Sequence, residues 1–335
     1  MKILVTGGLG YIGSHTVVEL LSEGHEVIVI DNLNNSKIEV RGKIEDISNK
    51  SFELVIGDVN DSKVLNDIFE SNEIEGVIHF AAHKAVGESV DHPVMYYHNN
   101  ISGLISLLGV MDKYKVSNLI FSSSCTVYGA TQDLPVTEKN DIQLAESPYG
   151  TSKIICEEII QDFTRHKPMK SILLRYFNPV GAHPSALIGE LPLGVPNNLV
   201  PFITQTAAGI RKELTVFGDD YDTVDGTCIR DYIHVVDLAK AHVKALDYSV
   251  SMNNSVDVFN VGTGKGNTVL EVIQAFDKVN NLSLPYKIGP RRGGDIEQIW
   301  ADTTKVNDVL GWTASYGIED MMKHAWKWQQ SLSQD

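Results

Sequence analysis

The stretch that decides the fold lies at the start of the chain and reads Ile3-Leu4-Val5-Thr6-Gly7-Gly8-Leu9-Gly10-Tyr11-Ile12-Gly13. Its apolar, β-branched beginning predicts a buried strand, and the spaced glycines predict a tight turn into a helix. Such a turn lets backbone N–H groups reach a pyrophosphate at the helix N-terminus. The glycine spacing alone also fits a plain turn. Its position between a strand and a helix favours a dinucleotide-binding loop that includes Gly7, Gly10, Tyr11, Ile12 and Gly13.

Two acidic residues follow the next two predicted strands. Asp31 comes eighteen residues after Gly13, where a carboxylate can accept both ribose hydroxyls and repel a 2′-phosphate, so NAD is favoured over NADP. Asp58 closes the third strand, where a doubly wound sheet presents residues to an adenine edge. The alternative for each is a residue that only begins a turn. We assign both to the cofactor site together with their neighbours Asn32 and Val59.

Short apolar segments alternate with amphipathic ones through the first half of the chain. The apolar segments are typical of buried parallel strands and span Ile3–Thr6, Glu26–Ile30, Phe52–Ile56, Val77–Ala81, Leu119–Ser123 and Ser171–Arg175. Helical patterns lie between them, for example at His15–Glu23, Val64–Glu70 and Tyr96–Tyr114. Repeated strand–helix–strand units predict an α/β fold with a doubly wound parallel (Rossmann) sheet covered by helices on both faces.

The composition changes after about Asn178, where segments rich in Pro, Gly, Asn and Asp begin. We therefore expect a smaller α/β substrate-binding domain made of residues 178–230 and about 263–335. The NAD-binding Rossmann domain comprises residues 1–177 plus about 231–262, because Val258–Gly262 is typical of another strand that ends in a turn.

The composition narrows the class of partner. A formal net charge of −15 over 335 residues argues against a sequence-independent grip on nucleic acid, which needs clustered Lys and Arg. The cysteines, at positions 125, 156 and 228, form no disulfide framework and no metal spacing. We expect structural roles for His79 and His83, and no metal. With no apolar stretch near the length of a membrane span, we expect a protein of the reducing cytoplasm.

Tyr149 and Lys153 form a Tyr-x-x-x-Lys pattern at the start of a predicted helix, and residues four apart share one helix face. A phenol with a pKa of about 10 is a poor base at neutral pH, but a nearby ammonium and a positive nicotinamide ring favour phenolate. Ser124, at the end of the fifth strand, can reach the same substrate hydroxyl. On an arbitrary helix such a pair is usually a surface feature. The upstream serine and glycine loop favour catalysis.

These residues resemble those of the extended short-chain dehydrogenase/reductases, and in particular the nucleotide-sugar epimerases among them. The resemblance spans nearly the whole chain and is carried by long segments, which are Gly10–Thr16, Lys84–Ser89, Arg175–Pro184 and Arg230–Val235. It implies tightly bound NAD that is regenerated in each turnover, and inversion at C4 of a UDP-hexose, from UDP-galactose to UDP-glucose and back. It also implies a homodimer that uses the helices beginning near Tyr96 and Tyr149.

The resemblance also implies roles for individual residues. Tyr149 would be the acid/base, Lys153 would bind the nicotinamide ribose, and Ser124 would assist at the sugar 4′-hydroxyl. Lys84, Asn99, Phe80 and Phe177 fall at cofactor positions. The UDP-sugar positions are Asn178, Asn198, Leu199, Phe217, Arg230, Arg292, Asp295 and Ile299. Guanidinium groups suit a diphosphate because they pair with its oxygens in a bidentate manner.

Three alternatives to an epimerase can be separated. A C4,C6-dehydratase needs an acid and a base after the strand-five serine, but Cys125-Thr126 follows Ser124 here. A non-catalytic NAD sensor would be expected to lose Tyr149, Lys153 or Ser124, and all three are present. A dehydrogenase would release NADH to solution, so accumulation of NADH in step with product would distinguish it from an epimerase. Ile299 is of intermediate size at a position that limits space beside the sugar 2′-substituent, so UDP-N-acetyl sugars remain a second possible substrate pair.

Overall fold

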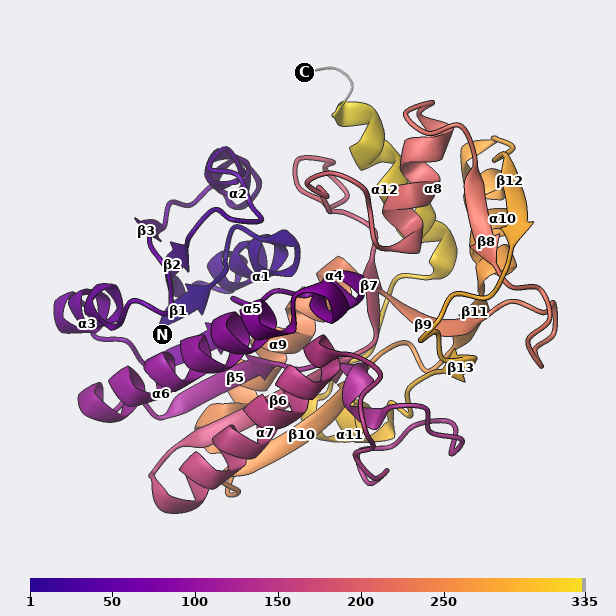
Figure 1. The fold of residues 1–335 in the computed structure, drawn as a ribbon. Helices are drawn as coiled ribbons and strands as arrows, with labels where there is room; N and C mark the ends of the chain where they lie inside the picture. Colours follow the sequence, from indigo (N-terminus) through magenta and orange to yellow (C-terminus); the bar gives the residue numbers. More distant parts are fainter. Residues whose placement is uncertain (333–335) are drawn as a thin grey trace.

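The computed structural model describes residues 1–332, and its larger part is built on a seven-stranded parallel sheet (Figure 1). The strand order is β10-β6-β5-β4-β1-β2-β3. The strands are β1 (Lys2–Thr6), β2 (Glu26–Asp31), β3 (Glu53–Ile56), β4 (Gly76–His79), β5 (Asn118–Ser122), β6 (Lys170–Tyr176) and β10 (Val256–Val261). The order reverses direction between β1 and β4, and ligands of open α/β sheets bind at such a switch point, outside the carboxyl ends of the strands.

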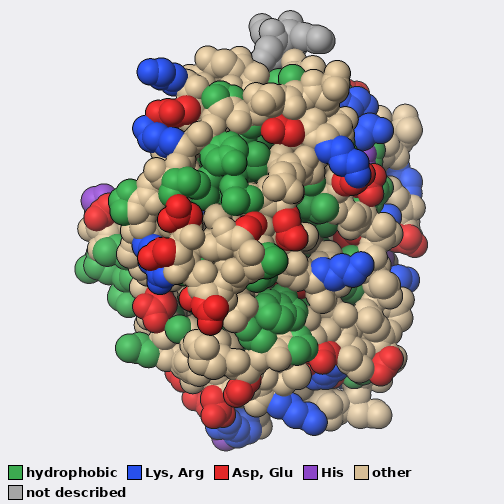
Figure 2. Space-filling model, turned by 90° about the vertical axis from the view of Figure 1, so that its right-hand side faces the viewer, with side chains coloured by type: hydrophobic (Ala, Val, Ile, Leu, Met, Phe, Trp, Pro, Cys, Tyr) green, Lys and Arg blue, Asp and Glu red, His purple; other side chains and the backbone are tan. Residues whose placement is uncertain are grey.

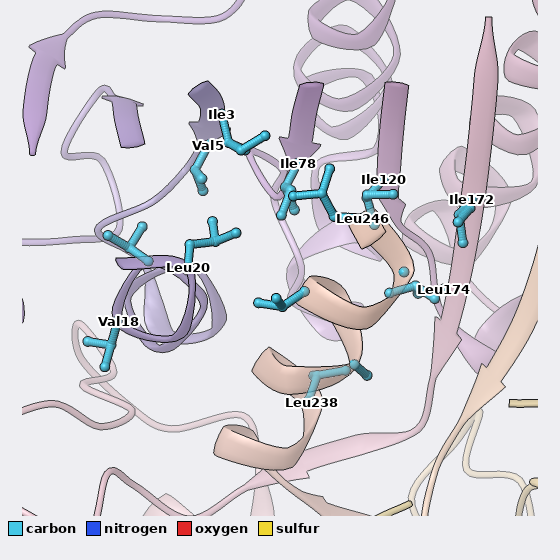
Figure 3. Close-up of a cluster of buried hydrophobic side chains, with 14 of the residues drawn as sticks. Ile3, Val5, Val18, Leu20, Ile78, Ile120, Ile172, Leu174, Leu238 and Leu246 are labelled. Atoms are coloured by element: carbon cyan, nitrogen blue, oxygen red, sulfur yellow. The ribbon is translucent and has the colours of Figure 1, made fainter. Parts of the chain in front are cut away.

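Helices cover both faces of this sheet because successive strand residues point to opposite faces. Ile3 and Val5 of β1 pack with α1 (Tyr11–Ser22) and α9 (Val235–Ser251), whereas Leu4 packs on the opposite side. Figure 3 shows Ile3, Val5, Ile78 and Ile120 pointing from the strands towards Leu20 of α1 and towards Leu238 and Leu246 of α9. Leu4 meets the layer of α3 (Ser62–Ser71), α6 (Gly103–Tyr114) and α7 (Pro148–His166).

The smaller part holds two further sheets and its own core. One sheet consists of β7 (Asn178–Val180), β9 (Ile229–His234), β11 (Gly266–Thr268) and β13 (Gln298–Ile299), and the other pairs β8 (Leu214–Phe217) with β12 (Tyr286–Gly289). The core lies between these strands and three helices, which are α8 (Leu199–Ala207), α10 (Val269–Asn280) and α12 (Ile318–Ser331). On the surface shown in Figure 2, Lys and Arg side chains lie scattered among those of Asp and Glu.

The predicted Rossmann sheet is confirmed, with shifts at several boundaries. The first helix begins at Tyr11 rather than His15, directly after the glycine turn. The helix expected over 96–114 is divided into α5 (Pro93–Tyr97), a π-helical turn (His98–Ser102) and α6. Such turns inside helices are frequent at functional sites. This turn contains Asn99, one of the residues assigned to the cofactor.

Two segments lie in a different part of the fold from the one that we predict from the sequence. Residues 231–234 belong to β9 in the second sheet, so the chain returns to the main sheet only with α9 and β10. Conversely, α11 (Thr304–Leu310) and Trp312 pack in the core of the large part, although they follow the smaller one in sequence. Strand periodicity cannot reveal which sheet a segment joins, because that depends on long-range pairing. Within residues 1–332, the helices fall short of the length and apolar character that a membrane span requires.

Candidate active site

The glycine turn after β1 has the backbone shape that a dinucleotide-binding loop needs. Gly7 has a φ of 69°, and a Cβ there would lie 2.9 Å from the Ala81 backbone nitrogen. A Cβ at Gly13 would lie 2.2 Å from the Gly7 carbonyl oxygen. Any larger residue would therefore push the turn away from the sheet edge. The turn leads directly into α1, whose N-cap Gly10 provides no side-chain cap for the first N–H groups of the helix. Uncapped N–H groups at a helix N-terminus suit an anion.

Two carboxylates accept hydrogen bonds from the loops around this turn. Asp31, buried at the end of β2, accepts hydrogen bonds from the Leu9 nitrogen at 3.0 Å and the Ser36 hydroxyl at 2.7 Å. Asp58 accepts one from the Asn32 amide at 2.8 Å. Burial alone would raise the pKa of Asp58, but hydrogen bonds from Asn60 and Asn32 outweigh it and leave the pKa lowered. The cofactor residues assigned after β2 and β3 are thus adjacent, and the buried Val59 follows Asp58.

Helix α7 carries Tyr149 and Lys153 on one buried face, and Ser124 lies against it. The Lys153 ammonium donates a hydrogen bond to the Ser122 carbonyl at 2.7 Å and lies 5.8 Å from the centre of the Tyr149 ring. Ser124 comes two residues after β5 and caps the 3₁₀ helix Cys125–Tyr128. Its hydroxyl is a hydrogen-bonding neighbour of the Tyr149 phenol. All three predicted catalytic residues therefore meet at the carboxyl end of β5.

Burial dominates the acid–base properties of this cluster. It raises the pKa of the Tyr149 phenol well above its ordinary value, Tyr176 adds to that rise, and Ser124 opposes it. Burial also lowers the pKa of Lys153 to about 8, against the opposing effects of Cys156 and Glu157. The expected lowering of the Tyr149 pKa by Lys153 does not prevail in the protein alone. The phenol is desolvated, and the ammonium is directed at the Ser122 carbonyl.

A buried ion pair that the sequence analysis did not identify supports this face of α7. Glu157, one turn beyond Lys153, pairs with Arg175 of β6 at 2.6 Å, and their side chains are 0% and 5% exposed. Glu157 also accepts a hydrogen bond from Ser123, the residue before Ser124. Arg175 donates to the Tyr128 hydroxyl at 3.0 Å. The periodicity Tyr149, Lys153, Glu157 on one helix face could have indicated it.

Other residues assigned to the cofactor lie around the same edge of the sheet. Phe80 directly follows β4 and packs against His242 of α9, with ring centres 4.7 Å apart. The Asn99 amide donates to Asn100 at 3.0 Å in the π-helical turn. Phe177 is buried with Ile299, which is assigned to the sugar, in one cluster beside Cys125. One residue assigned to the cofactor and one assigned to the substrate are thus in the same apolar cluster next to Ser124.

The residues assigned to UDP come from the smaller part and are more exposed. The Arg292 guanidinium pairs with Asp295 at 2.6 Å and lies 5.8 Å from the centre of the Phe217 ring. Arg230 donates to the Ile229 carbonyl at 2.8 Å. Asn178 begins β7, and its register partner is Tyr232 in the neighbouring strand β9. The diphosphate-binding role of the two arginines stays a prediction.

Asn198 and Leu199 mark the start of α8. Asn198 is the N-cap residue, but its side chain makes no cap and instead donates to Glu190 at 3.0 Å. Lys84, assigned to the cofactor, forms an ion pair with the same carboxylate at 2.9 Å. Glu190 lies in a Pro/Gly-rich segment without a periodic pattern, so no local sequence signal predicts a role for it.

These observations fit a dinucleotide cofactor. The glycine turn has no room for side chains, which leaves its backbone open to a pyrophosphate, and Asp31 is the last residue of the second strand. The residues that would hold NAD are the glycine turn, Asp31, Asp58, Lys84 and Lys153.

Comparison with known proteins agrees with this geometry. The family model described as GDP-mannose 4,6 dehydratase matches residues 4–325. The UDP-glucose 4-epimerase of Bacillus subtilis (strain 168) is 50% identical over 333 residues, covering 99% of this chain and 97% of that protein. The UDP-glucose 4-epimerase of Haemophilus influenzae is 50% identical over 332 residues, covering 99% and 98%.

Solved structures are similar over the same extent. The UDP-glucose 4-epimerase of Stenotrophomonas maltophila, with bound NAD and formylated UDP-arabinopyranose, has a TM-score of 0.97 at 46% identity, covering 100% of this chain and 99% of that one. The enzyme of Bifidobacterium longum, in complex with NAD⁺ and UDP, has a TM-score of 0.95 at 48% identity, covering 99% and 98%. This chain belongs to the UDP-glucose 4-epimerases within the extended short-chain dehydrogenase/reductase family.

Proposed function

We propose that this protein interconverts UDP-galactose and UDP-glucose by inverting the configuration at C4, with one NAD that stays bound through turnover. The observation that carries the proposal is the buried cluster of Tyr149, Lys153 and Ser124 at the carboxyl end of β5. It lies at the edge of the sheet where the glycine turn would present NAD.

In this proposal Tyr149 moves one proton in each direction. As phenolate it takes the proton of the sugar 4′-hydroxyl, and as phenol it returns the proton after the 4-keto sugar has turned its other face. Bound NAD⁺ would accept the C4 hydrogen as hydride and give it back, and its positive ring would favour the Tyr149 phenolate. Ser124 would orient the 4′-hydroxyl, and Lys153, one helical turn beyond Tyr149, would hold the nicotinamide ribose. Burial of the cluster excludes water from the proton transfer.

The nucleotide must be held while the sugar turns. Arg230 and Arg292 lie on the smaller part and suit the diphosphate of UDP. Asp295, which pairs with Arg292, belongs to the same proposed nucleotide site. Asn178, Asn198, Leu199 and Phe217 would complete the nucleotide site. A loose sugar pocket is required, because tight recognition of either epimer would oppose the rotation. We therefore propose that the protein binds the UDP portion firmly and the sugar only weakly.

The 3% exposed Ile299 is proposed to limit the sugar 2′-substituent. Replacing it with Gly enlarges the pocket, so we expect the preference for UDP-N-acetylglucosamine over UDP-glucose to rise about tenfold in competition assays. Ile299→Tyr should lower that preference. Equal preferences in both variants would contradict this role.

We also propose a homodimer that uses α4 (Val86–Asp91), α5, α6 and α7. Apolar side chains on the first three of these helices are exposed, among them Val94 at 78%, together with Val86, Val90, Met95 and Ile105. Val94→Glu should shift the mass measured by light scattering towards the monomer, whereas Val250→Glu on α9 should not.

We further propose a reducing, cytoplasmic location. The three cysteines, which are buried and unpaired, support it.

The direct test is conversion of UDP-galactose to UDP-glucose by the purified protein with no added cofactor. We expect full turnover and a nicotinamide nucleotide released on denaturation. NADH that accumulates in solution in step with an oxidised product would instead identify a dehydrogenase. If the protein carries no nicotinamide nucleotide and converts no UDP-sugar when NAD is supplied, the proposal is wrong.

A further inference from the structure

Glu190 joins one residue assigned to the cofactor with another assigned to the substrate. Its Oε1 atom accepts hydrogen bonds from the Lys84 ammonium at 2.9 Å and the Asn198 amide at 3.0 Å. Lys84 follows β4 of the large sheet, whereas Asn198 begins α8 of the smaller part. One carboxylate oxygen thus bridges the two parts of the molecule where the two ligands would meet.

The position of this carboxylate is fixed by its surroundings. The Trp328 indole of α12 donates to the Glu190 carbonyl at 2.9 Å. The preceding Gly189 has no room for a side chain, since its Cβ would lie 2.5 Å from the Trp328 ring. The Glu190 side chain is only 12% exposed. A carboxylate held in this way can restrict the two longer side chains that bind to it.

The glycine turn takes part in the same arrangement. The Tyr11 hydroxyl donates to the Gly181 carbonyl at 2.7 Å, which ties the turn to the segment that leads to Glu190. The Lys84 ammonium lies 5.6 Å from the centre of the Tyr11 ring. Burial, and then the charge of Glu190, raises the pKa of Tyr11 well above its ordinary value. The carboxylate therefore lies close to three assigned ligand-binding side chains.

Asn198 gives a further reason to assign a role to Glu190. An N-cap asparagine ordinarily accepts a hydrogen bond from its own helix. Here it donates to Glu190 instead, so α8 forgoes a local stabilisation for a contact with the carboxylate that also binds Lys84 of the large part.

We propose that Glu190 is a positioning residue that couples the NAD and UDP-sugar sites through Lys84 and Asn198. The inference rests on the proposed function. Without the carboxylate, both side chains regain rotational freedom and must be ordered by the ligands themselves. Each ligand then binds more weakly, and binding of one no longer prepares the site of the other. The proton-transfer cluster on α7 is unaffected.

The test compares Glu190→Ala and Glu190→Gln with the wild type. UDP affinity is measured by calorimetry and NAD retention by dialysis of the loaded protein. For Glu190→Ala we expect UDP to bind about five- to tenfold more weakly, NAD to be lost faster, and kcat to change less than KM. Glu190→Gln keeps an acceptor oxygen, so it should restore part of both. Asp112→Ala is the matched control, because it removes an exposed ion pair with Lys167 of similar length, 2.8 Å, on α6.

A double variant distinguishes the proposed positioning role of Glu190 from a merely structural one. If Glu190 acts on NAD through Lys84, adding Glu190→Ala to Lys84→Met should cause little further loss of NAD. Full additivity of the two losses, or unchanged UDP and NAD binding in Glu190→Ala, would overturn the inference. A wild-type protein that binds neither UDP nor NAD would instead refute the proposed function.

Discussion

The proposed catalytic end of α7, with Tyr149, Lys153 and Glu157, and the proposed nucleotide end of the smaller part, with Arg292 and Phe217, are built in opposite ways. Tyr149, Lys153 and Glu157 are buried and held by hydrogen bonds within the protein. Arg292 and Phe217 at the nucleotide end are 55% and 43% exposed. Groups that transfer protons must be ordered before the substrate arrives, because misplacement by about 1 Å can cost a hundredfold in rate. Groups that hold a nucleotide can be ordered by it.

The first prediction removes the acid/base alone. Tyr149→Phe keeps the buried ring but has no hydroxyl, so we expect turnover to fall at least about a thousandfold. NAD retention and the melting temperature should stay close to those of the wild type. The measurement is kcat for UDP-galactose beside the nucleotide content of the purified variant. Near-normal turnover would contradict the assignment of the catalytic end.

The second prediction disturbs the support of the catalytic end. Glu157→Gln leaves the Arg175 charge buried without its partner, which should lower the free energy of unfolding by about 3–5 kcal/mol. Urea unfolding monitored by circular dichroism measures the loss. Combining Glu157→Leu with Arg175→Met removes both charges and should cost less than the single change. A loss below about 1 kcal/mol in Glu157→Gln would show that the pair does not stabilise this face.

A third prediction concerns three buried histidines outside the two regions, in α1, β4 and β9. Burial lowers the pKa of His15 and His79 to about 3 and that of His234 to about 2. Their unfolded forms titrate near pH 6.5, so the folded state binds fewer protons below that pH. Stability from these groups is therefore full above pH 6.5 and falls as the pH drops towards 3, by about 1.4 kcal/mol per histidine per pH unit.

His234 provides the clearest variant for this prediction. Its Nε2 atom lies 3.0 Å from Nδ1 of His324, and its ring stacks on that of Tyr316 with ring centres 4.2 Å apart. His234→Gln cannot be protonated and should reduce the slope of unfolding free energy against pH between 6.5 and 5. Its stability at pH 7.5 is the internal control. An unchanged slope would show that this histidine is not buried in its neutral form.

The smallest predicted effect is at the exposed nucleotide end. Arg292→Leu removes a charge suited to a diphosphate, and we expect KM for UDP-galactose to rise about tenfold with kcat nearly constant. The free energy of unfolding should change by less than about 1 kcal/mol, because the Arg292 side chain of the ion pair with Asp295 is exposed to solvent. If kcat fell more than KM rose, Arg292 would belong to the catalytic end.

The two regions also differ in how far the sequence predicts them. The glycine turn, Asp31 and the Tyr149–Lys153 spacing follow from local rules, because each depends on one strand, one turn or one helix face. The residues assigned to the nucleotide are scattered over several elements, and the assignment rests only on resemblance. Glu190 and the Glu157–Arg175 pair depend on long-range packing. For the same reason, residues 231–234 lie in the second sheet rather than in the main one.

The central claim is that hydrogen leaves C4 of the sugar and returns to the same carbon within one closed site. UDP-galactose carrying deuterium at C4 tests it directly, with the product examined by mass spectrometry and NMR and no cofactor added. We predict that UDP-glucose keeps the deuterium at C4. Loss of the label to water would contradict the account, because it would mean that C4 exchanges with solvent during inversion.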